Sequence, residues 1–132
     1  MKFNSITRTV LLIPVFALIN FVAFAQLTVQ SIEVGTSIEN RELIGADSTF
    51  SSDVNTLYCH TTINGAENEP TIKHVWYYNG EEQASINLNV RSENFRTWSS
   101  KKIWHTWTGN WKVEVLDAND NVLASKEFTI KP

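Results

Sequence analysis

Aromatic and basic side chains are interleaved between residues 95 and 116 of this 132-residue chain. Four of the five tryptophans lie within this segment, beside an arginine and three lysines. Aromatic faces and cationic groups together can bind a partner by stacking, cation–π contact and charge-assisted hydrogen bonds. We therefore predict a binding surface in this segment rather than a reaction centre. The candidate residues are Arg96, Trp98, Lys101, Lys102, Trp104 and Trp107.

Nucleophilic chemistry finds little support in the sequence. Cys59 precedes His60, but neighbours on a strand point to opposite faces, which keeps this pair apart. Ser99 and Ser100 belong to no nucleophile elbow, and no pair of carboxylates stands out. We predict no catalytic residues and no enzyme, and an uncharacterised hydrolase is the weakest of the alternatives.

Metal binding needs several ligands that converge. His60 and His74 lie on predicted strands that could be neighbours and could share a face, but no H-x-H spacing pre-forms a site. Histidines that form hydrogen bonds on a half-buried sheet explain both residues. We predict no metal and no cofactor.

The elements that position these residues are all predicted to be strands. Turn-forming residues recur every eight to twelve positions after residue 26, and β-branched or aromatic residues fill the intervals. Strands are predicted at 27–34, 54–63, 71–78, 83–90, 95–103, 111–115 and 122–130, with little regular structure at 38–50 except for one short edge strand. Asn79-Gly80 predicts a type I′ hairpin turn. This pattern predicts an all-β, immunoglobulin-like antiparallel β-sandwich of about seven strands.

The alternation of side chains along the predicted strands indicates which tryptophans are buried. Trp76 lies on a middle strand, and Trp111 is in phase with the valines that follow it, so both are predicted to be in the core. Trp104 and Trp107 fall in a loop, where large rings either cover the edge of the sandwich or face a ligand. The sequence leaves the orientation of Trp98 open.

The N-terminus has the features of a secretory signal peptide. Lys2 and Arg8 precede an apolar run, and Ala23-Phe24-Ala25 fits a signal peptidase site before Gln26. We predict a signal peptide at 1–25, a single domain at 26–132, no stable membrane span after cleavage, and a periplasmic or secreted location. Cys59 is the only cysteine, so no internal disulfide is expected.

Removal of residues 1–25 makes the chain more acidic. The segment carries two of the 11 basic residues and none of the 14 acidic ones, so the net charge moves from −3 to −5. An acidic domain without basic runs argues against nucleic acid as a partner. The sequence sets no oligomeric state.

Three motifs resemble those of a known family. They are H-x-W-Y-Y-N-G at 74–80, R-T-W-S-S-K at 96–101, and W-T-G-N-W-x-V-x-V-x-D at 107–117. In this order, over about 52–131, the chain resembles the DUF2914 domains of bacteria. The resemblance implies a small exported or membrane-tethered all-β domain and supplies no catalytic residues.

Two functions remain after these exclusions. The first is an exported, non-catalytic module that binds a protein in the cell envelope through the aromatic and basic surface at 96–107. The alternative is a carbohydrate-binding module with a tryptophan platform. Two coplanar exposed rings would favour a glycan, and a single ring among charges would favour a protein.

Overall fold

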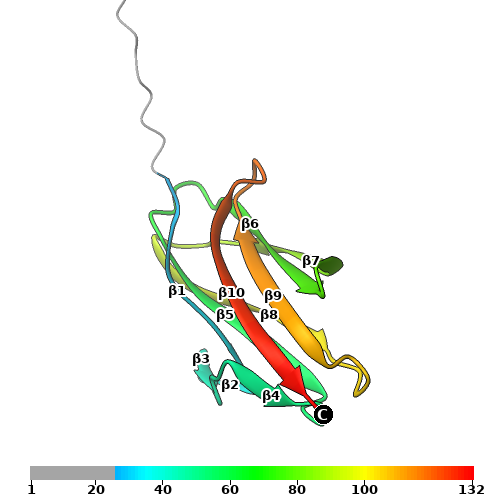
Figure 1. The fold of residues 1–132 in the computed structure, drawn as a ribbon. Helices are drawn as coiled ribbons and strands as arrows, with labels where there is room; N and C mark the ends of the chain where they lie inside the picture. The colour runs from blue at the N-terminus through cyan, green and yellow to red at the C-terminus, as the bar shows by residue number, and fades with distance from the viewer. Residues whose placement is uncertain (1–25) are drawn as a thin grey trace, which may run out of the picture.

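Residues 26–132 are described by the computed structural model, and in this range the chain forms ten strands and no helix. Seven strands have eight to ten residues, which is the number predicted, and three have three residues each. Eight of them form two packed sheets, which Figure 1 shows, and the other two form a separate small hairpin. The strands are β1 (Thr28–Gly35), β2 (Ser37–Glu39), β3 (Glu42–Ile44), β4 (Thr49–Ser51), β5 (Thr56–Asn64), β6 (Thr71–Tyr78), β7 (Glu81–Asn89), β8 (Asn94–Lys102), β9 (Gly109–Leu116) and β10 (Val122–Lys131).

The two sheets form an immunoglobulin-like sandwich, as predicted. One sheet has the order β1-β5-β8 and the other β4-β10-β9-β6-β7. All pairings are antiparallel except that of β4 with β10, which is parallel. The predicted short edge strand corresponds to β4. The small β2–β3 hairpin is additional to the prediction.

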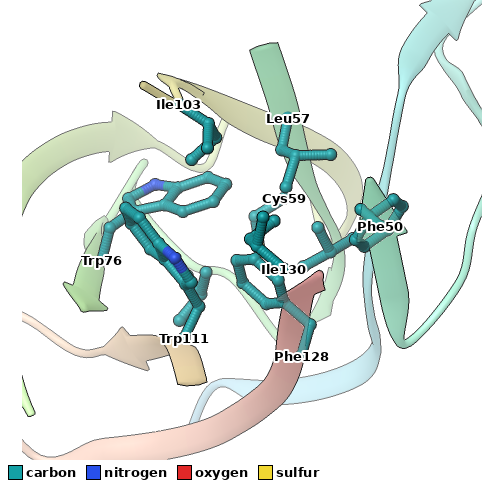
Figure 2. Packing of buried hydrophobic residues seen from close by; sticks show 10 residues of the cluster. Phe50, Leu57, Cys59, Trp76, Ile103, Trp111, Phe128 and Ile130 are labelled. Atoms are coloured by element: carbon teal, nitrogen blue, oxygen red, sulfur yellow. The ribbon is translucent and has the colours of Figure 1, made fainter. Parts of the chain in front are cut away.

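The core fills the space between the sheets. Trp76 and Trp111 are both buried, as predicted, and each packs against Phe128 at ring-centroid distances of 6.2 and 5.9 Å. Figure 2 shows these rings with Leu57 and Ile130, which come from opposite sheets. A second, smaller cluster, formed by Ile63, Ile72, Val90 and Val115, continues the core.

One local prediction, the turn at Asn79-Gly80, is confirmed. Asn79 and Gly80 have φ angles of 48° and 83°, the left-handed conformation that a type I′ turn requires at both central positions. The pairing of β1 with β5 shifts register between Val29 and Ser31, which is an irregularity within the strand.

The predicted signal peptide at 1–25 lies outside the described residues. In the part of the chain that the structure describes, no helix is long and apolar enough to cross a membrane.

Candidate functional site

The six candidate residues divide into two groups. Strand β8 is an edge of the three-stranded sheet, and its alternation turns Thr97 and Ser99 into the core. Arg96 and Trp98 therefore lie on the outer face of that sheet. The other four candidates lie at the end of β8 and in the connection from β8 to β9, near one end of the sandwich. The structure thus does not bring all six into one surface.

The first group contacts the β2–β3 hairpin. The Arg41 guanidinium lies 5.3 Å from the ring centroids of both Phe95 and Trp98. It also donates a hydrogen bond of 2.7 Å to the backbone carbonyl of Arg96. The Arg96 side chain forms an ion pair with Glu42 of the same hairpin. Both candidates in this group therefore already have partners within the chain.

Trp98 also contacts its cross-strand neighbour His60. Its ring stacks on His60, with centroids 6.1 Å apart and planes only 3° apart. The His60 Nε2 atom lies 2.8 Å from the Arg41 carbonyl oxygen. Because both Arg41 of the hairpin and His60 contact the ring, Trp98 is partly buried and does not form an open platform.

The second group contains the exposed aromatic surface. Trp104 is 51% exposed, whereas Trp107 is partly buried against Tyr78 and Trp111, with both centroid distances at 5.8 Å. The Trp104 and Trp107 rings meet edge to face, with centroids 6.4 Å apart and planes at 82°. Trp107 thus connects the exposed ring to the aromatic core.

Hydrogen bonds hold this connection in place. The Trp107 amide donates to the Trp104 carbonyl at 2.9 Å, which closes a turn. The indole N–H of buried Trp111 donates to the Trp107 carbonyl at 3.0 Å, and the Tyr78 hydroxyl donates to the Thr108 carbonyl at 2.7 Å. These hydrogen bonds attach the β8–β9 connection to the core. The exposed Trp104 ring therefore extends from an ordered segment rather than from a mobile loop.

Two lysines lie against these rings. The Lys102 ammonium is 4.9 Å from the Trp104 centroid, and the Lys101 ammonium is 5.1 Å from the Trp107 centroid. Partial burial lowers the pKa of Lys101. Both contacts combine a cation with an aromatic face, and Trp104 remains half exposed beside Lys102.

A shallow pocket of about 420 Å³ lies beside Trp104. We call the residues that line it the Trp104 patch. Sequence reasoning missed the contribution of residues 52–55, because they lie about fifty positions earlier in the chain. They reach the patch through the pairing of β5 with β8 and a 2.8 Å hydrogen bond from the Ile103 amide to the Asn55 carbonyl. The patch consists of Ser52, Asp53, Asn55, Lys102, Ile103, Trp104 and His105.

A serine and a histidine do meet, but they meet in the core. The Ser99 hydroxyl lies 2.7 Å from His74 Nδ1, and the Trp76 indole N–H donates to Ser99 Oγ at 3.0 Å. His74 Nε2 lies 3.2 Å from the Thr61 hydroxyl, which donates to the Thr97 carbonyl at 3.0 Å. These contacts form one chain of hydrogen bonds that joins the two sheets.

The donor and the acceptor at the two ends of this hydrogen-bond chain determine the direction of each hydrogen bond in it. An indole N–H is only a donor and a carbonyl only an acceptor. Ser99 therefore accepts from Trp76 and donates to Nδ1 of His74, so neutral His74 carries its proton on Nε2 and donates to Thr61. Burial, and secondarily the charge of His60, lower the pKa of His74 to about 4. His74 and Ser99 are 0% and 5% exposed, so no substrate reaches this pair.

The other reactive side chains are also separated. Cys59 is fully buried, and burial raises the pKa of its thiol. The suggestion that His60 and His74 share a face of neighbouring strands was wrong, because β5 and β6 belong to different sheets and His60 points outward. Among residues 26–132, no three His, Cys, Asp or Glu side chains lie close enough to hold a metal ion.

A second depression, of about 510 Å³, lies on the five-stranded sheet. Its centre is a cross-strand row on the outer face formed by Tyr77, Lys112 and Glu127. The Lys112 ammonium lies 4.9 Å from the Tyr77 centroid and covers one face of that ring. This depression is larger than the pocket beside Trp104, but Tyr77 is partly buried whereas Trp104 is 51% exposed, so we place the candidate site at the Trp104 patch.

Comparisons with known proteins give one family and two similar structures. Residues 69–130 match the family model described as "Protein of unknown function (DUF2914)", a shorter range than the predicted 52–131. None of the curated proteins matches the chain. The CARDB domain of the PF1109 protein from Pyrococcus furiosus, solved in complex with di-metal ions, is 18% identical, with a TM-score of 0.45, over 81% of this chain and 94% of that one. A GH3 β-glucosidase from Bifidobacterium adolescentis is 10% identical, with a TM-score of 0.44, over 81% of this chain and 17% of the enzyme.

Proposed function

We propose, from the geometry of the site, that the chain is a non-catalytic module that binds a protein. Residues 69–130 match the DUF2914 family, which is described only as of unknown function. The Trp104 patch is the contact surface of this module. The partner presents an acidic surface with an apolar recess for the indole ring, and it lies in the cell envelope or outside the cell.

A single observation carries this proposal. Trp104 is 51% exposed, and among residues 26–132 it is the only tryptophan whose side chain is exposed rather than partly or fully buried. Lys102, His105 and Asp53 surround it. One large aromatic ring inside a polar rim is the arrangement of an interface hot spot, where burial of the ring supplies most of the binding energy.

The glycan alternative has weaker support. Sugar rings stack on flat aromatic platforms, but Trp104 and Trp107 stand at 82° to each other. Trp98 is partly buried against His60 and Arg41, so it does not supply a second exposed ring. The positive charges beside Trp104 also complement an acidic protein surface better than a neutral sugar.

The hydrolase alternative requires an accessible nucleophile and base. Ser99 and His74 have the required contact at 2.7 Å but lie in the core. Trp76 and Thr61 occupy the remaining hydrogen-bonding positions around this pair, which leaves no position from which a substrate is attacked.

We expect Trp104→Ala to weaken binding strongly and leave the fold intact. An acidic polymer such as polyglutamate, added to the purified protein, should change the tryptophan emission, and the change should weaken as salt is raised. In Trp104→Ala the affinity should fall at least about 30-fold, as for a hot-spot residue. The stability should change by less than about 1 kcal/mol, because the ring is half exposed.

Val122→Ala is the matched control. Val122 is 55% exposed and lies in the β9–β10 hairpin, at the far end of β9 from Trp104, so its removal should leave the response unchanged. A response to soluble neutral glycans, without one to polyglutamate, would replace the protein hypothesis with the carbohydrate-binding alternative.

Export is the remaining part of the proposal. It rests on the signal-peptide pattern at 1–25, with Ala23-Phe24-Ala25 before Gln26. We expect the protein isolated from its native cells to begin at Gln26, as measured by intact mass and N-terminal sequencing. Retention of Met1 would show that residues 1–25 are not removed. A membrane-tethered form would then be the alternative to export.

A further inference from the structure

Strand β7 forms an outer edge of the five-stranded sheet, where it pairs with β6 on one side only. Figure 1 shows no strand beyond it. The backbone N–H and C=O groups of an edge strand that point away from its neighbour form a row that another strand can bind. Within residues 26–132, no strand pairs with this side of β7.

The other sheet edges carry features that oppose such pairing. Strand β8 bears Arg96, Lys101 and Lys102, and β4 has only three residues. Strand β1 runs beside β10, where Glu33 approaches Lys126 at 3.5 Å. Charged side chains, short length and cover by neighbouring elements are the usual protections of an edge.

In β7 these protections are absent over most of its length. From residue 83 to 90 the sequence is Q-A-S-I-N-L-N-V, with neither charge nor proline. The register against β6 shifts near Gln83, so the strand is regular from residue 84 to 89. Ala84, Ile86 and Leu88 pack against the core, and Ser85 and Asn87 are exposed. One face of β7 is thus held against the core, and its other face is polar and exposed.

We propose that β7 pairs with β7 of a second copy of this chain, antiparallel about a two-fold axis at Ile86. This register keeps the core-facing residues of both copies on one side and sets Ser85 opposite Asn87. Beyond this regular stretch, it also brings the end of β7 that carries the exposed Glu81 near the exposed Arg91 that follows β7 in the other copy. Opposite charges at both ends favour this register.

The pairing would produce a closed dimer. A two-fold contact uses the same edge of both copies, so neither β7 edge remains free afterward. The protected edges of β8, β4 and β1 do not extend the sheet further. This interaction is independent of the Trp104 patch, which lies at the end of the sandwich, so failure of one proposal leaves the other intact.

Sedimentation velocity of the purified protein, from about 1 µM to about 1 mM, tests this proposal across the affinity range of weak homodimers. The dimer fraction should rise with concentration, and amide exchange of residues 84–89 should slow in parallel. Ser85→Lys with Asn87→Lys should abolish the dimer, since four ammonium groups then crowd one face. Asn110→Lys with Ser125→Lys adds the same charge at exposed positions inside the sheet and should leave the dimer unchanged.

Charge exchange tests the register and does not depend on how well the lysine variant folds. Glu81→Arg and Arg91→Glu should each weaken the dimer, and their combination should restore it. A protein that stays monomeric over the whole range overturns the proposal. A dimer that survives both lysines in β7, or that the combined charge exchange fails to restore, also overturns it.

Discussion

Replacing Trp111 by alanine should lower the free energy of unfolding by about 3–5 kcal/mol, the usual cost of deleting a large aromatic ring from a core. Trp111 is 2% exposed and stacks on Phe128 at 5.9 Å, with the ring planes 18° apart. Its indole N–H also donates a hydrogen bond to the Trp107 carbonyl. The mutation therefore removes both core packing and a hydrogen bond that fixes the β8–β9 connection. Urea denaturation followed by circular dichroism measures the change.

The other tryptophans of this connection provide the internal control. Trp104→Ala should cost less than about 1 kcal/mol because the ring is half exposed. Trp107→Ala should fall between the two, since Trp107 is partly buried against Tyr78 and Trp111. An equal cost for Trp104 and Trp111 would mean that Trp104 is part of the core, and it would remove the basis of the proposed binding surface.

Acid should destabilise the domain through His74. The pKa of this buried imidazole is lowered from 6.5 to about 4, chiefly by burial, so the unfolded chain takes up the proton first. A lowered pKa contributes stability that is complete above pH 6.5, declines as the pH falls, and is lost below about pH 4. The difference corresponds to a loss of about 3 kcal/mol.

The hydrogen bonds of His74 explain why its protonation lowers the free energy of unfolding. Protonated His74 donates from both nitrogens, so Ser99 can no longer donate to Nδ1 while it accepts from Trp76. The Ser99 hydroxyl hydrogen then has lost its acceptor within the core. The free energy of unfolding, measured from pH 7 to pH 4, should fall more steeply for the wild-type protein than for His74→Gln, in which the carboxylates still titrate. Equal slopes for the two proteins would show that His74 is not the group responsible.

Much of the fold could be predicted because its strands have local signals. In β5 and β9 the side chains alternate between core and surface, and this placed Trp111 in the core before any contact was known. The turn at Asn79-Gly80 is encoded by two residues that accept positive φ. Such features depend on neighbours in sequence, which a single chain displays directly.

The β2–β3 hairpin could not be predicted in the same way. Its strands have three residues each, too few for a periodic pattern, and its turn residues Asn40 and Arg41 adopt positive φ without a glycine. Contacts with distant residues stabilise it instead, including the packing of Arg41 on Phe95 and Trp98. Those contacts also decide that Trp98 is partly covered, which the sequence left open.

The candidate site shows the same division. Proximity in sequence grouped six residues, but strand alternation and the hairpin separate Arg96 and Trp98 from Trp104. The prediction that Trp104 and Trp107 lie in a loop is confirmed, and the structure distinguishes the exposed ring from the one that supports it. The meeting of Ser99 with His74 depends on the packing of two sheets, for which the sequence carries no local signal.

The central claim is that Trp104 contacts a protein partner, and photo-crosslinking in living cells tests it most directly. A benzophenone amino acid in place of Trp104 should form one discrete protein adduct on irradiation, and the same group in place of the equally exposed Val122 should form none. The identity of that adduct would name the partner. Identical adduct patterns at the two positions, or no protein adduct at position 104, would contradict the claim.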